Sequence, residues 1–247
     1  MKNIVLKLLC VALLAGVVVS CVRFNDDSAV PKRRWQVGDG NLYSRTLEIG
    51  DYQHIVLSGS MIVRYCPGKS SLFWIETDSN LVSQIMPEVK DGVLTINTDS
   101  ISPTQLTIVT GSKTLRTLTT AGSCHIVIKD TMSLPKLEVN LSGASDLAVK
   151  KPMVVDTFRL SAAGASNVML KGKVKNGLVS TTGAGQFDLT KCDFSKLEIV
   201  SVGGSDIGLG KVEELSYNLS GACKLTYPKN TNVVDASILG ACKLTVK

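Results

Sequence analysis

Apolar and polar residues alternate along most of the chain, and a short run of small residues interrupts the alternation at regular intervals. In one such segment, Leu137, Val139 and Leu141 share one parity, whereas Glu138 and Asn140 share the other. Successive side chains of a β-strand point to opposite faces, so this period of two predicts strands with one buried face. No segment shows convincing helical periodicity.

The small-residue phrase recurs about every 20 residues, as in NLSGASDLAV, RLSAAGASNV, STTGAGQFDL, VSVGGSDIGL, NLSGACKLTY and SILGACKLTV. Each copy has a central glycine, which we expect at a structural corner. These corner glycines are Gly59, Gly122, Gly143, Gly164, Gly183, Gly203, Gly221 and Gly240. Gly59 precedes Gly122 by 63 residues, or three periods of 21, so two intervening copies lack the glycine.

A unit of about 20 residues cannot bury its own apolar face and must stack on its neighbours. The sequence therefore predicts an all-β fold, a right-handed parallel β-helix (solenoid) with one coil per repeat, because parallel crossovers are almost always right-handed. An antiparallel sandwich or barrel is the main alternative. Within a coil, Gly143 and Ser145 share the parity of Leu141 and Leu147, so both are expected to face the interior.

The two ends of the predicted solenoid differ. In PEVKDGVLTINTD, the pair Asp91-Gly92 between alternating runs predicts an antiparallel hairpin near the N-terminal coils, which would cap that edge. At the other end the sequence stops at Lys247, inside the last coil. An uncovered edge there favours a homo-oligomer formed through terminal coil edges.

The N-terminal residues are expected to lie outside the fold. Residues 1–20 combine two early lysines with a continuous apolar run, the pattern of a signal peptide. The run ends in small residues directly before Cys21, which resembles a bacterial lipobox and predicts acylation of that cysteine. A plain signal peptide with an incidental cysteine, or a membrane anchor helix, is the alternative. Residues 21–41 are expected to be a flexible tether, and residues 42–247 the β-helical domain.

A lipid anchor on Cys21 would make the membrane a partner and place the chain in the cell envelope. We expect an outer membrane lipoprotein, either periplasmic or exposed at the surface. The formal net charge of +6 falls to +4 without Lys2 and Lys7, and no block of five like charges occurs. Basic residues are not interleaved with aromatic ones, so nucleic acid is not an expected partner.

Five of the seven cysteines fall within the expected domain: Cys66, Cys124, Cys192, Cys223 and Cys242. Their number is odd, and they form no CxxC pair or Cys/His cluster with metal-ligand spacing, so no metal or cofactor is expected. Cys223 and Cys242 lie one coil apart, near enough to bridge. Their side chains would point in parallel, which favours free thiols, with a disulfide as the alternative.

One outward position after each corner is polar and forms a predicted column, which we call the polar ladder: His125, Asp146, Asn167, Gln186, Asp206, Lys224 and Lys243. Stacked coils would bring these side chains within about 5 Å of one another. Such a ladder would contact a glycan or a protein ligand, or it would simply form a solvated face. Asp146 and Asp206 are three coils apart, too far to share a Ca²⁺ ion.

The only histidines are His54 and His125, and no acid–base constellation surrounds either in the sequence. We therefore assign no catalytic residue and expect a protein that is not an enzyme.

A lipobox, an early LSGSMIV strand, the EVKDGVLTI hairpin and the repeated LSGAS phrases occur together in this chain. In this combination the chain, over residues 40–247, resembles the putative auto-transporter adhesin family with the head GIN domain, common among lipoproteins of Bacteroidetes. The resemblance implies a β-helical, non-catalytic envelope lipoprotein that binds glycan or protein through its surface. A structural or self-assembling envelope module and a polysaccharide-active β-helix enzyme are the alternative functions.

Overall fold

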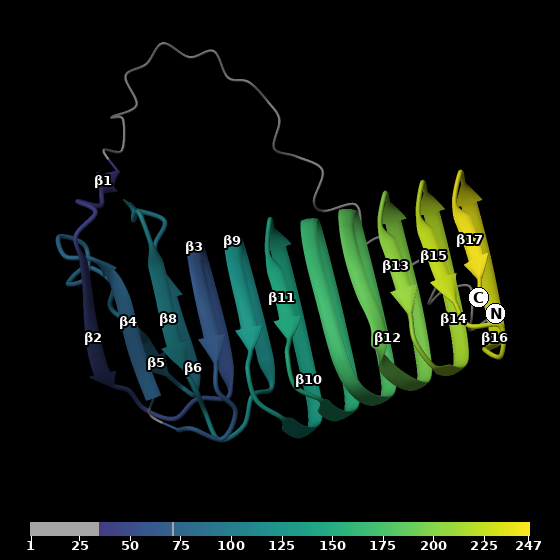
Figure 1. Ribbon diagram of the computed structural model, residues 1–247, viewed down its shortest axis with the longest axis horizontal. Helices are drawn as coiled ribbons and strands as arrows, with labels where there is room; N and C mark the ends of the chain where they lie inside the picture. The colour runs from purple at the N-terminus through teal and green to yellow at the C-terminus, as the bar shows by residue number, and fades with distance from the viewer. Residues whose placement is uncertain (1–34, 71) are drawn as a thin grey trace, which may run out of the picture. The chain divides into compact units, whose positions relative to one another are not determined.

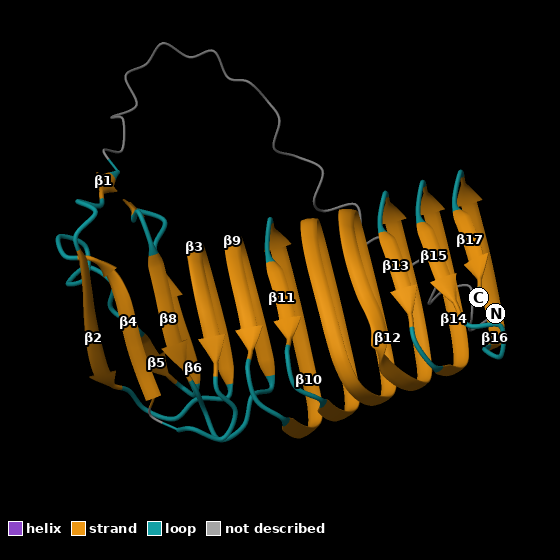
Figure 2. Cartoon of the chain, in the orientation of Figure 1, coloured by secondary structure: helices purple, strands orange, loops and turns teal. Residues whose placement is uncertain are grey.

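The computed structural model describes residues 35–70 and 72–247, and their regular structure is entirely β-strand (Figure 2). This is the all-β class that the alternation predicts. Within the described residues, no helix has the length and apolar character that a membrane crossing requires. The expected signal peptide, residues 1–20, and the expected lipidation site Cys21 lie outside the described residues.

The C-terminal half of the chain consists of segments that pair in parallel with the segment one repeat away (Figure 1). We call each repeat a coil. The strands are β9 (Thr117–Ile128), β10 (Met132–Gly143), β11 (Asp146–Val149), β12 (Met153–Gly203), β13 (Asp206–Leu209), β14 (Val212–Gly221), β15 (Lys224–Tyr227), β16 (Asn232–Gly240) and β17 (Lys243–Val246).

The register of this pairing follows the repeat of the sequence. Gly143 lies beside Gly122 on one side and beside Gly164 on the other. Near the C-terminus, Gly221 lies between Gly203 and Gly240 in the same way. Equivalent positions of successive repeats are thus neighbours in space, and any column of equivalent residues in the sequence becomes a column on the molecule.

The interior of the coils is a stack of equivalent apolar residues. Leu137 pairs with Phe158 and Val139 with Leu160 across the β10–β12 ladder, and all four are buried. Stacking apolar residues on like residues removes area from water in every coil, at about 25 cal/mol per Å². Each coil therefore depends on its neighbours for its core.

The N-terminal coils depart from the expected order. β3 (His54–Tyr65) pairs along its whole length with β9, so Gly59 lies directly beside Gly122. The expectation of two intervening coils between these glycines is wrong. On its other side, β3 pairs with β6 (Val93–Asn97) and β8 (Leu106–Thr110), because the chain leaves β3, builds the coil outside it, and then returns to β9.

The predicted hairpin is confirmed. β5 (Glu88–Lys90) pairs antiparallel with β6 across a two-residue turn, in which Asp91 has φ 51° and Gly92 has φ 74°. Positive φ at both central residues is the geometry that favours an Asp-Gly pair. The hairpin places β5 at the outer edge of β6.

Further strands complete the N-terminal end. β4 (Leu72–Asp78) runs antiparallel to both β2 (Leu42–Glu48) and β8. β1 (Gln36–Val37) pairs with β7 (Ile101–Ser102). The folded unit comprises Trp35–Lys247, so β1 lies within the span of residues 21–41.

Candidate functional site

The small-residue phrase forms a bend in the backbone between two strands. At one residue of this bend, the burial differs from the one that the alternation of the sequence predicts. Leu141 and Ser145 are buried as expected, but Ser142, Gly143 and Ala144 are exposed. The prediction that Gly143 faces the interior is wrong, because the backbone bends at the corner and the inward–outward alternation of side chains is interrupted there. Gly143 has φ 89°, a conformation that residues with a side chain rarely adopt.

A second constraint also requires glycine at this corner. A Cβ atom on Gly143 would overlap the carbonyl oxygen of Gly122 in the neighbouring coil. The same positive φ occurs at all eight corner glycines of the sequence, and from Gly122 onward each would collide with the preceding glycine of the column. The close approach of the backbones leaves no room for a side chain.

Several of the inward side chains next to the corner bond to one another, although Ser166 Oγ is buried without a partner among the described residues. Thr120 Oγ1 donates to Ser145 Oγ at 3.0 Å, and Thr181 Oγ1 donates to Ser201 Oγ at 2.8 Å. Cys223 Sγ lies 3.2 Å from Ser201 Oγ. These polar atoms are buried, so they complete the interior and are not available to a ligand.

The five cysteines of the folded unit are all free thiols, including Cys223 and Cys242. Burial raises the pKa of the Cys124 thiol to about 11 and that of the Cys192 thiol to about 12. A thiol that stays protonated is a poor nucleophile. These two cysteines therefore serve as small packing residues.

The residues of the polar ladder lie in one column, at the positions that the sequence predicts. The first three of them are joined by hydrogen bonds. Asp146 pairs in register with His125 on one side and with Asn167 on the other. His125 Nδ1 lies 3.4 Å from Asp146 Oδ2, and Asn167 Nδ2 donates to Asp146 Oδ1 at 2.8 Å. Asp146 is thus the centre of a three-residue group.

The other members continue the column. The backbone N–H of Gln186 donates to Asn167 Oδ1 at 3.2 Å, which joins the two halves of the ladder. Asp206 pairs in register with Gln186 and Lys224, and Lys224 Nζ donates to Asp206 Oδ2 at 2.7 Å. Lys243 lies beside Lys224 in the last coil. The structure therefore brings all seven predicted ladder residues together.

The ladder side chains remain open to solvent despite these bonds. The side chains of His125 and Asp146 are 48% and 40% exposed, and those of Lys224 and Asp206 are 47% and 49% exposed. Hydrogen bonds join the first four members of the column and, separately, Asp206 and Lys224, whereas Lys224 and Lys243 are both donors. The result is a line of partly bonded polar groups along the stacked coils.

Neither a metal site nor a nucleophile–base pair appears on this column. Across residues 35–70 and 72–247, no three His, Cys, Asp or Glu side chains gather closely enough to hold a metal ion. His54, the other histidine, lies away from the ladder, with its Nδ1 2.6 Å from Thr117 Oγ1.

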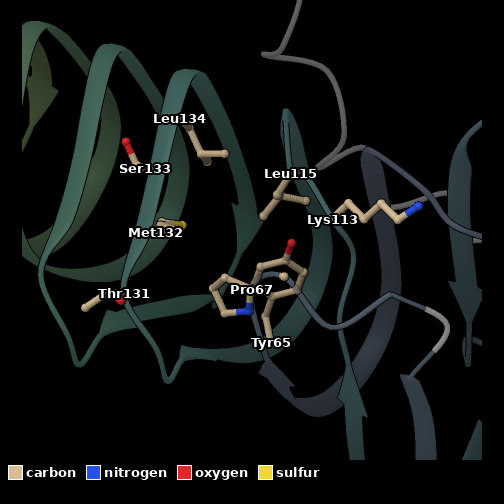
Figure 3. A pocket seen from close by; sticks show the side chains of 9 residues that line it. Tyr65, Pro67, Lys113, Leu115, Thr131, Met132, Ser133 and Leu134 are labelled. Carbon is tan, nitrogen blue, oxygen red and sulfur yellow. The ribbon is translucent and has the colours of Figure 1, made fainter.

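A pocket of about 200 Å³ lies where β3 ends, and the sequence did not indicate it. Its lining comes from three separate segments, around Tyr65, Leu115 and Met132 (Figure 3). The Tyr65 hydroxyl lies 2.8 Å from Ser112 Oγ, and burial raises the pKa of this tyrosine. The pocket is smaller than typical ligand cavities of about 300–1,000 Å³.

A shallower groove of about 400 Å³ crosses the coils between Val154 and Glu213. Its lining includes three lysines and three acidic residues, which are Lys173, Lys175, Lys211, Asp156, Asp193 and Glu213. Positive and negative groups are therefore balanced within it.

Comparison with known proteins identifies relatives of this fold. A family model described as "Putative auto-transporter adhesin, head GIN domain" matches residues 51–231. No curated protein matches the sequence.

Three solved structures illustrate the similarity, and each covers 85% of this chain and 98% of its own. A putative adhesin from Bacteroides fragilis is 18% identical, with a TM-score of 0.76. A putative lipid binding protein from Parabacteroides distasonis is 22% identical, with a TM-score of 0.70. A putative adhesin from Parabacteroides merdae is 20% identical, with a TM-score of 0.62. At these low identities, the similarity to the three solved structures shows a shared fold and nothing about what this chain binds.

Proposed function

The chain belongs to the putative auto-transporter adhesin family with the head GIN domain, and from this premise we propose that it is a non-catalytic adhesin of the cell envelope. It binds a glycan or protein through the polar ladder. The stacked coils act as a right-handed parallel β-helix that presents the ladder, and lipidation of Cys21 holds the chain on the outer membrane.

The observation that carries this proposal is the bonding within the ladder. The side chains around Asp146 and Asp206 are fixed by their neighbours yet stay about half exposed. A ligand that binds preorganised polar groups loses less entropy to ordering than one that binds mobile side chains. The sugar hydroxyls of a glycan can both donate to Asp146 and accept from Lys224.

A glycan and matrix-protein array tests the proposal. The full chain is expected to bind at least one class of ligand, and the double variant Asp146→Ala/Asp206→Ala is expected to lose at least about tenfold in affinity, since removing partners of charged hydrogen bonds costs about 1.5–3 kcal/mol each. Asp130→Ala/Asp235→Ala is the matched control, because it removes two exposed carboxylates away from the ladder.

Two results would contradict the proposal. One is an equal loss of binding in the ladder and control variants. The other is turnover of a bound polysaccharide that disappears in His125→Ala, which would favour the polysaccharide-active enzyme. The lipid anchor is tested separately by fatty-acid labelling, which Cys21→Ser should abolish.

The last coil favours a second candidate, a self-assembling envelope module. Among the residues that the structure describes, β16 pairs only with β14 and β17 only with β15, which leaves one edge of each strand unpaired there. Ile238, Leu239 and Val246 on these strands are 46%, 70% and 52% exposed. Unpaired, apolar edge strands readily pair with another chain, and a second copy facing this edge across a two-fold axis would cover it.

Sedimentation of the full chain tests this candidate. Self-assembly predicts a mass of two chains that returns to one chain in Ile238→Lys. The mass of a single chain at all concentrations would contradict it.

A further inference from the structure

A second column of charged residues lies at the opposite corner of the coils, after β11, β13, β15 and β17 end. Figure 1 shows β13, β15 and β17 side by side, with two turns of β12 between them and β11. Six lysines, one in each of six successive coils, follow this edge, and we call them the lysine ridge: Lys129, Lys150, Lys171, Lys191, Lys211 and Lys229.

The strand register aligns the first three lysines. Val149 pairs with Ile128, so the next residues, Lys150 and Lys129, are neighbours. Ala148 pairs with Met169, which by the same register places Lys171 next to Lys150. Lys151 stands beside this group and adds to its charge.

The remaining lysines lie in the corresponding connections of later coils. Leu189 pairs with Leu209 and Phe194 pairs with Val212, so the short connection that holds Lys211 lies beside the longer one that holds Lys191 and Asp193. Gly208 pairs with Thr226, so Lys229 follows in the next coil. The backbone N–H of Lys229 donates to the carbonyl oxygen of Lys247 at 2.6 Å, so Lys247 extends the ridge into the last coil.

The charges on the ridge are largely uncompensated. Lys211 is the one ridge lysine with an ion pair among the described residues, at 3.6 Å from Glu213. Five ridge lysines are exposed, and Lys171 is half-buried. Asp130, Asp193 and Glu213 are near in sequence and too few to neutralise the ridge.

The two columns of the same molecule therefore differ in their electrostatics. On the polar ladder, Asp146 accepts a hydrogen bond from Asn167 and Asp206 accepts one from Lys224, and Lys224 and Lys243 are the one pair of adjacent cations. On the ridge, Lys129 lies beside Lys150 and each later coil adds one more lysine, at a coil spacing of about 4.8 Å. Like charges directly opposite one another destabilise a sheet, so the ridge costs folding free energy unless a ligand neutralises it.

We propose that the lysine ridge is a binding site for a linear acidic polysaccharide, which lies along the coils and pairs its carboxylates with successive lysines. The site is separate from the polar ladder, and the inference does not depend on the function proposed for that ladder. A row with one cation per coil matches a polymer that carries its charges at regular intervals along its length.

The chemistry of the ridge favours a polysaccharide over the other polyanions. Single-stranded nucleic acids are bound by aromatic side chains on which bases stack, and the six ridge positions are all lysine. Interfacial membrane binding buries an apolar face beside the basic one. The apolar residues just before the first three ridge lysines, Ile128, Val149 and Leu170, are buried in the core. The residues before the other three are Thr190, Gly210 and Pro228, which offer no large apolar face.

Binding to immobilised polygalacturonate tests the proposal, with dextran as the uncharged polysaccharide. The full chain should bind polygalacturonate and not dextran, and its affinity should fall as salt increases. In Lys150→Gln/Lys171→Gln/Lys191→Gln, the affinity at low salt should fall at least about tenfold, and the slope of log affinity against log salt should decrease by about 2–3, close to one per lysine removed.

The matched control is Lys69→Gln/Lys90→Gln/Lys113→Gln, which removes the same charge from exposed lysines outside the ridge. It should retain most of the affinity, as should Asp146→Ala/Asp206→Ala on the polar ladder. Thermal melting of both triple variants verifies that they are folded. An equal loss in the two triple variants would overturn the site, and equally tight binding of single-stranded DNA or anionic vesicles would overturn the choice of ligand.

Discussion

At the scale of single residues, the repeated phrase is explained by the backbone. The corner glycines combine a positive φ with a carbonyl oxygen of the next coil at the place where a side chain would start. Both constraints act on the main chain and neither involves a ligand. Only the residues that follow the corner on the outside, such as Asp146, are free to vary with function.

The substitution Gly143→Ala should destabilise the fold by at least about 1–3 kcal/mol, the cost of a strained backbone conformation, with the clash against Gly122 adding to it. Urea unfolding measures this change. Gly204→Ala is the control, because its φ is ordinary and a Cβ there meets no atom within 4 Å. Equal destabilisation by both substitutions would show that the corner geometry is wrong.

The buried thiols predict how stability depends on alkaline pH. The unfolded thiol ionises above its ordinary pKa of 9.0, whereas the folded Cys192 stays protonated up to its raised pKa of about 12. The contribution of the Cys192 thiol to the free energy of unfolding is fully present below the thiol's pKa in the unfolded chain. This contribution is lost as the pH rises from that value toward the thiol's pKa in the folded protein. By one pH unit above the unfolded pKa the loss is about 1.4 kcal/mol.

Urea unfolding of the wild type and of Cys192→Ala, each at neutral and alkaline pH, isolates this contribution. The variant should lose about 1.4 kcal/mol less than the wild type on going to the alkaline pH. An identical loss in both proteins would mean that the Cys192 thiol ionises in the folded state as easily as in the unfolded one.

At the scale of the elements, the sequence predicted the strands, the hairpin and the polar ladder, because each rests on local periodicity. Asp91 and Gly92 form the expected turn, and equivalent residues such as Asp146 and Asn167 become neighbours once coils stack. Parity failed at Gly143, where the chain bends and the period of two is interrupted.

The pairing of strands that are far apart in the sequence could not be predicted from the local alternation of residues. The strand β3 lies between β9 and the pair β6 and β8, an arrangement that the spacing of glycines did not reveal. The lysine ridge was missed for a related reason. Its members are separated by about 20 residues each, so no run of like charges appears in the sequence.

The hairpin turn gives a prediction at this scale. Gly92→Ala should weaken the β5–β6 hairpin by about 1–2 kcal/mol, because a residue with a Cβ pays this cost in the left-handed region. Hydrogen exchange of the β5 and β6 amides measures the effect. Asp91→Asn should stay within about 0.5 kcal/mol of the wild type, and comparable loss of protection in both variants would argue against this turn geometry.

At the scale of the whole molecule, fold and recognition are assigned to different sets of residues. The inward residues and corner glycines build the stack, whereas the polar ladder and the lysine ridge line two outer edges of it. Because each coil contacts only its neighbours, a coil is the unit by which such a molecule lengthens or shortens.

Deleting one whole coil tests this central claim most directly. In a chain that lacks residues 144–164, Gly143 is joined to Ala165, and every remaining strand keeps an equivalent neighbour. Circular dichroism during heating should show a β-sheet spectrum and one cooperative transition, whereas a chain that lacks residues 144–153, half a coil, should not fold. Loss of folded structure in the whole-coil deletion, to the same extent as in the half-coil deletion, would contradict the equivalence of the coils.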